Sequence, residues 1–113
     1  MYNITKKDII DLNLQFSNGN IIKGERLDYA LDFTKNCDDW IKSLSYIVRA
    51  IVLDHVFEDG NKRTTALLIK TIVEYEGYKI DNSDLMRILV HIAQRRLSSI
   101  KTIEGKLKYV IRK

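Results

Sequence analysis

Residues 61–77 read NKRTTALLIKTIVEYEG, and they predict a helix that ends at Gly77. Between residues 66 and 75 only Lys70, Thr71 and Glu74 interrupt a run of apolar side chains. A helix that is apolar on nearly every side is typical of the buried centre of a fold. We therefore expect the helix over residues 61–76 to be the centre around which the other elements pack.

Apolar side chains at helical spacing recur on both sides of this stretch. A first helix is expected to begin after Thr5, with Thr5 and Asp8 as a capping box, and to end at residues 18–20. Further helices are expected over residues 25–33, over residues 39–54, from Asn82 or Ser83 onward, and over residues 103–111. The predicted fold class is all-α.

Length and composition agree with this prediction. The chain has 113 residues, no proline and five glycines, whereas sandwiches and barrels need many turn residues. A chain of this size accommodates one core, so residues 1–113 are expected to form a single domain. The sequence therefore predicts a compact single-domain helical bundle around a central buried helix.

Several classes of protein are excluded at this point. The longest purely apolar runs have four residues, as in residues 50–53, and a membrane-spanning helix needs about 20. Residues 1–7 show no hydrophobic region behind their lysines, so no secretory signal is expected. Cys37 is the only cysteine, which favours a reducing compartment. We expect a cytoplasmic protein without membrane contact.

The net charge of +4 is compatible with anionic ligands. Basic residues gather only near the C-terminus, at Lys106, Lys108, Arg112 and Lys113. Cations are favoured at the C-terminal end of a helix, and no nucleic-acid motif accompanies these residues. Nucleic acid is therefore not an expected partner.

His55 continues the apolar stripe of the helix over residues 39–54. That stripe runs through Leu44, Val48 and Ile51, and a further step of four residues reaches His55. We therefore expect the imidazole to point inward.

The residues that carry chemistry are 55–64, HVFEDGNKRT, between the helix over 39–54 and the helix over 61–76. The free backbone N–H groups of a helix N-terminus form a site for phosphate. Gly60 has no Cβ to keep a ligand from the backbone. Lys62 and Arg63 occupy the first turn, where the helix dipole disfavours cations unless an anion offsets them.

The remaining parts of a phosphate-transfer site are close by in the sequence. Asp59 is a hard oxygen ligand of the kind that Mg²⁺ takes together with phosphate oxygens. His55 is a candidate general base near neutral pH. Phosphoryl and nucleotidyl transfer need positioned phosphates, a metal ion, cations and a base, and all of these fall within nine residues.

Residues 55–63 resemble the signature of the Fic/Doc superfamily, His-x-Phe-x-Asp/Glu-Gly/Ala-Asn-Gly/Lys-Arg. The likeness to small Doc-type (death-on-curing) toxins of toxin–antitoxin systems extends over residues 4–93. It includes LDYAL at residues 27–31 and the aromatic-glycine end of the helix at residues 75–78. The resemblance implies a Fic/Doc-like helical fold and a transferase activity.

The resemblance also implies a role for each matching residue. His55 would be the catalytic base that deprotonates the hydroxyl of the target, and Phe57 would pack inward and hold the loop. Asp59 would bind Mg²⁺. Gly60, Asn61 and Lys62 would form the anion hole, and Arg63 would bind the nucleotide phosphates.

Position 62 separates two activities within the family. Doc-type toxins have lysine there, as here, and are associated with transfer of the terminal phosphate of ATP to a hydroxyl of a translation factor. Many enzymes that transfer AMP have glycine there. Gly60 departs from the Doc type, which has alanine. Because Lys62 matches the Doc type, we expect phosphoryl transfer from ATP to a Ser, Thr or Tyr hydroxyl. AMP transfer is the alternative.

A third interpretation is a catalytically silent module that binds a nucleotide or an antitoxin-like protein. The chain also lacks the inhibitory Ser/Thr-x-x-x-Glu-Gly/Asn pattern of many Fic proteins, because Ile100 stands four residues before Glu104. The resemblance therefore implies a separate antitoxin protein as a partner.

Three other functions are less favoured. His55 and Asp59 are spaced for zinc, but a third ligand is missing unless the distant His91 supplies it. Cys37 is a potential nucleophile with no histidine near it in the sequence. Residues 60–64 lack the earlier glycine and the preceding strand of a Walker-type phosphate loop.

Overall fold

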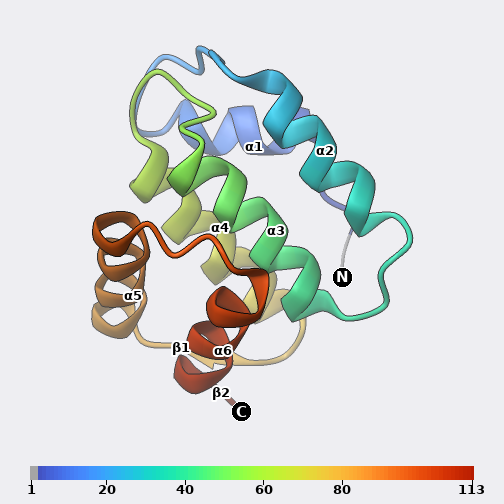
Figure 1. Cartoon of the computed structure of the whole chain (residues 1–113), viewed down its shortest axis with the longest axis vertical. Helices are drawn as coiled ribbons and strands as arrows, with labels where there is room; N and C mark the ends of the chain where they lie inside the picture. The colour runs from blue at the N-terminus through green and yellow to red at the C-terminus, as the bar shows by residue number, and fades with distance from the viewer. Residues whose placement is uncertain (1–2) are drawn as a thin grey trace.

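The computed structural model describes residues 3–113, and in this range it contains six helices and one two-stranded sheet (Figure 1). The helices are α1 (Lys6–Asn13), α2 (Gly24–Thr34), α3 (Trp40–Leu53), α4 (Asn61–Tyr75), α5 (Asn82–Arg95) and α6 (Ile100–Val110). The strands are β1 (Lys79–Ile80) and β2 (Ile111–Arg112). The predicted all-α bundle is confirmed.

Most helix ends lie where the sequence predicts them. The Thr5 and Asp8 capping box is present, Asp39 caps α3, and Gly77 follows α4 with a φ of +87°. The cap of α5 is Asp81, one residue before the two predicted candidates. The first helix ends at Asn13, earlier than predicted.

The helix at the centre is α3 and not α4, so this part of the prediction is wrong. Nine residues of α3 are buried, against six of α4. In Figure 1, α3 runs through the middle of the molecule, and α2, α4, α5 and α6 all pack against it. Tyr75 of α4 is 65% exposed, and Ala66 and Leu67 are only partly buried. The apolar residues of α4 thus include an outward face.

The small sheet is a feature that the sequence analysis did not predict. Lys79 pairs with Arg112 and Ile80 pairs with Ile111, in antiparallel register. Two-residue segments carry too little periodicity to be recognised as strands. The pairing joins the turn after α4 to the end of α6 and so closes the bundle at the end far from residues 55–60 (Figure 1).

None of the helices in residues 3–113 has both the length and the apolar composition needed to cross a membrane. The expectation about a secretory signal rests on residues 1–7, of which Met1 and Tyr2 lie outside the described residues. Cys37 is partly buried in the turn before α3, where its thiol contacts the backbone oxygen of Asp39 at 3.5 Å.

Candidate functional site

The link between α3 and α4 places His55 at the surface. The helix α3 ends at Leu53, and His55 takes a left-handed conformation with a φ of +51°. The stripe of α3 therefore does not continue to His55, whose side chain is exposed. The expected inward orientation is wrong, because the chain turns after Asp54 and buries Val56 and Phe57 instead.

A short extended segment before α2 holds this link in place. The backbone N–H of Ile22 donates to the carbonyl oxygen of Val56 at 2.8 Å, and the N–H of Glu58 donates to that of Asn20 at 3.0 Å. The Glu58 carboxylate also accepts a hydrogen bond from the Asn20 amide at 3.1 Å. His55 thus lies on a loop that is hydrogen-bonded to the segment before α2, and the next two residues, Val56 and Phe57, are buried.

The side chain of Asn61 braces the same loop. Its Oδ1 accepts from the backbone N–H of Phe57 at 3.0 Å, and its Nδ2 donates to the carbonyl oxygen of Phe57 at 2.9 Å. Phe57 is 1% exposed, as the resemblance implied. Both polar atoms of the Asn61 amide thus bond to the backbone of Phe57, and the second N–H of Nδ2 and the backbone N–H of Asn61 are the donors left for a ligand.

Gly60 is the N-cap of α4 and has a φ of +77°. A Cβ at this position would lie 3.2 Å from Nδ2 of Asn13 and 3.6 Å from Cβ of Phe16. The end of α1 therefore approaches the backbone at Gly60 closely. The left-handed conformation and this approach, more than access for a ligand, account for glycine here.

Asn13 is a residue of this site that the sequence analysis missed. Its side chain is fully buried, and its Nδ2 donates to the carbonyl oxygen of Asp59 at 2.9 Å and to Oγ1 of Thr64 at 3.0 Å. Its Oδ1 accepts from the backbone N–H of Gly19 at 2.9 Å. Asn13 thereby joins α1 to both sides of the turn at Gly60.

The first turn of α4 is open to an anion. Gly60 has no side chain to cap the helix, and the first bond of the helix runs from the N–H of Thr64 to the carbonyl oxygen of Gly60 at 2.9 Å. Within residues 3–113 the backbone N–H groups of Asn61, Lys62 and Arg63 have no hydrogen-bond acceptor. These three N–H groups are the donors that an anion would use.

Two cationic side chains lie within the same turn. Lys62 and Arg63 are exposed, and neither forms an ion pair with a carboxylate of residues 3–113. The first turn of α4 holds no acidic residue. Two cations at the positive end of a helix dipole are unfavourable without an anion.

These groups line one open hollow of about 550 Å³, here named the α4 hollow. Its walls include His55, Asp59 and the whole of residues 60–63. A volume of this size lies in the range of small-molecule sites. The structure therefore brings together every residue that the sequence singled out for catalysis, metal binding and phosphate binding. Phe16, Val52 and Glu58 complete the lining.

No group of three or more His, Cys, Asp and Glu side chains within residues 3–113 is arranged to hold a metal ion. Asp59 is exposed at the α4 hollow, and its carboxylate is one oxygen ligand. Mg²⁺ usually takes one or two carboxylates together with substrate phosphates and water, so a single aspartate beside a phosphate site fits it. His91 lies on the exposed face of α5 and does not line the α4 hollow, which disfavours the zinc alternative.

The residues that the sequence analysis missed had weak signals. Asn13 is a polar residue on the apolar face of α1, and such a residue is a candidate for a buried hydrogen-bonding role. Phe16 lies three residues beyond the end of α1 and is 37% exposed, and no pattern in the sequence marks it as part of the site.

Comparisons with protein-family models, with curated proteins and with solved structures found no match to this chain.

Proposed function

We propose that this protein transfers the terminal phosphate of ATP to a hydroxyl side chain of a target protein, as the resemblance of residues 55–63 to Doc-type toxins implies. The observation that carries the proposal is the first turn of α4. There three unbonded backbone N–H groups and two cations without carboxylate partners in residues 3–113 border the same hollow as His55. Phosphates are the ligands that such a turn favours.

Each residue has a proposed task in the reaction. The acceptor hydroxyl gives its proton to His55, and its oxygen forms a bond to the γ-phosphorus of ATP. The bond from that phosphorus to the bridging oxygen breaks, so ADP leaves and the target carries the phosphoryl group. Lys62, Arg63 and the N–H groups of the first turn stabilise the charge on the phosphate oxygens.

Asp59 would hold Mg²⁺ in this proposal. When bound, the ion neutralises charge on the phosphates of ATP. The protein itself positions Asp59 and His55. Asn13, Asn61 and the segment before α2 hold the loop that carries His55 and Asp59 beside the turn where the phosphates would bind.

AMP transfer is the second candidate. In that reaction the hydroxyl oxygen would bond to the α-phosphorus, and pyrophosphate would leave. The residue that favours it is Gly60, because the Doc type has alanine at this position. Lys62 favours phosphoryl transfer, because many AMP-transferring enzymes have glycine at that position. The two reactions therefore differ in which phosphorus atom of ATP the hydroxyl oxygen attacks.

An antitoxin protein remains a proposed partner. A second open groove adjoins the α4 hollow, with Phe16 and Arg63 lining both. It continues over Ala66 and Leu67 of α4 to Met86 of α5, which is 38% exposed. A partner with an apolar segment that covered this groove would also cover the phosphate site at Arg63.

The proposal is tested by label transfer to protein in a host-cell lysate. Two ATP preparations carry the label at the γ- or at the α-phosphate, in the presence of Mg²⁺. The variant His55→Ala is compared with His91→Ala, because His91 is the other of the two histidines and is exposed on α5. We expect γ-label on a protein target with the wild type and with His91→Ala, and none with His55→Ala.

Other outcomes would assign other functions. Transfer of the α-label would indicate AMP transfer, and lysine at position 62 would then not be a marker of phosphoryl transfer. If neither label were transferred although the protein still bound ATP, the silent binding module would replace both enzymes. Equal transfer by wild type and His55→Ala would remove His55 from the mechanism.

A further inference from the structure

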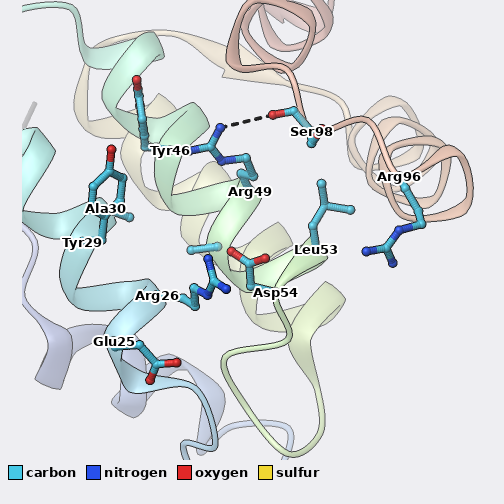
Figure 2. A pocket seen from close by; sticks show the side chains of 11 residues that line it. Glu25, Arg26, Tyr29, Ala30, Tyr46, Arg49, Leu53, Asp54, Arg96 and Ser98 are labelled. Carbon is cyan, nitrogen blue, oxygen red and sulfur yellow. Dashed lines mark hydrogen bonds between the residues drawn. The ribbon is translucent and has the colours of Figure 1, made fainter.

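A second open hollow, of about 570 Å³, lies between α2, α3 and the turn from α5 to α6 (Figure 2). We name it the arginine hollow, because Arg26 of α2, Arg49 of α3 and Arg96 at the end of α5 all line it. It shares no lining residue with the α4 hollow. The proposed transfer reaction therefore leaves these three arginines without a role.

The three guanidinium groups have no carboxylate partner in residues 3–113. Glu25 and Asp54 line the same hollow, yet neither lies within ion-pair distance of an arginine. In Figure 2, Arg26 lies on the α2 side of Asp54, and Arg96 reaches toward Leu53 and Asp54 from the α5 side. Arginines from three separate elements thus line one space, together with the carboxylates of Glu25 and Asp54.

Arg49 is held in a defined position. Its Nη1 donates to the carbonyl oxygen of Ser98 at 3.2 Å, and its guanidinium lies 5.1 Å from the centre of the Tyr46 ring. Tyr46 is stacked on Phe33, with ring centres 3.8 Å apart. A guanidinium fixed by its own contacts loses less side-chain freedom when it binds a ligand.

The rest of the hollow suits an organic group. Ala30, Ala50 and Leu53 are buried and supply an apolar floor. The ring of Tyr29 is exposed at the rim, and Tyr46 adds a second aromatic wall. An aromatic or sugar-like body could contact these surfaces while its hydroxyl or amine groups donate to Asp54 or Glu25.

We propose that the arginine hollow binds a small organic phosphate. A phosphate monoester carries up to two negative charges and accepts paired hydrogen bonds from planar guanidinium groups, which matches a cluster of arginines better than one of lysines. The apolar floor and the tyrosines would take the organic body, which bare phosphate lacks. This site is independent of the proposed transferase reaction.

The test is a titration of the ¹⁵N-labelled full chain with phenyl phosphate, followed by amide NMR signals. We expect saturable changes around Ala50 and Ser98. Arg26→Gln and Arg96→Gln should each weaken binding about tenfold or more, the loss expected for one charge-assisted hydrogen bond. Arg95→Gln is the matched control, because Arg95 precedes Arg96 and does not line the hollow.

The circular dichroism spectrum and melting curve of each variant establish that it remains folded. Changes confined to residues 60–63, equal affinity of Arg95→Gln and Arg96→Gln, or no binding at millimolar phenyl phosphate would overturn the proposal. A second titration uses inorganic phosphate. Equal affinity for inorganic phosphate and for phenyl phosphate would refute an organic ligand. Binding that persists in His55→Ala would separate this site from the transferase.

Discussion

Asn13 shows how a single buried side chain positions the proposed site. Its amide uses both polar atoms to join α1 to the carbonyl of Asp59, to Thr64 and to Gly19. The candidate site residues could be recognised in the sequence because they are consecutive and chemically distinctive. It did not predict Asn13, whose partners lie as far as 51 residues away in the chain.

Asn13→Ala should lower the free energy of unfolding by about 1–3 kcal/mol, because the buried partners of the amide lose their hydrogen bonds. Urea denaturation measures this change. Asn36→Ala is the control, since Asn36 is exposed and its side chain forms no hydrogen bond within residues 3–113. Equal stability of the two variants would contradict the bracing role.

Two glycines should respond to alanine in opposite directions. Gly60→Ala should lower the free energy of unfolding by about 1–2 kcal/mol, because alanine is strained in the left-handed conformation and its Cβ would press on Asn13. Gly105→Ala should stabilise by about 0.5–1 kcal/mol, because Gly105 lies within α6 and a Cβ there meets nothing within 4 Å. Thermal unfolding distinguishes them. A loss at Gly105 as large as that at Gly60 would contradict this reading of both positions.

At the scale of elements, the sequence predicted the helices better than their arrangement. The apolar pattern locates each helix, but it cannot show which of two apolar helices lies at the centre. Small serines, Ser43 and Ser45, allow α3 to be buried on several sides although they lower its hydropathy. Conversely, α4 keeps an apolar outward face beside the site, which makes it look more buried in sequence than it is.

The two serines of α3 provide a test of its central position. Both are fully buried, but Ser45 Oγ donates to the carbonyl oxygen of Ile41 at 2.8 Å, and Ser43 Oγ has no partner in residues 3–113. Ser43→Ala should therefore leave stability unchanged or raise it by about 0.5 kcal/mol, because it removes an unsatisfied hydroxyl and favours the helix.

Ser45→Ala is the comparison, and it should be the less stable variant because a hydrogen bond is lost. Chemical denaturation of both variants measures the difference. A clear loss of stability in Ser43→Ala, larger than that in Ser45→Ala, would contradict the burial of an unbonded hydroxyl on α3.

At the scale of the whole molecule, the end of α3 divides two hollows. Leu53 and Asp54 line the arginine hollow, whereas Val52 and His55 line the α4 hollow. Most residues of the α4 hollow could be grouped from the sequence because residues 58–63 and His55 are close together in the chain. The arginine hollow could not be predicted, since Arg26, Arg49 and Arg96 are separated by tens of residues and only the packing of α2, α3 and α5 unites them.

The central claim is that the first turn of α4 binds the phosphates of a nucleotide. Its most direct test is a titration of the ¹⁵N-labelled protein with ATP and Mg²⁺, observed at each backbone amide. We predict that the N–H signals of Asn61, Lys62 and Arg63 change most. Arg63→Gln should weaken binding about tenfold or more, and Arg87→Gln, which alters an exposed residue of α5, should not. Absence of these changes at millimolar ATP, or changes confined to other residues, would contradict the claim.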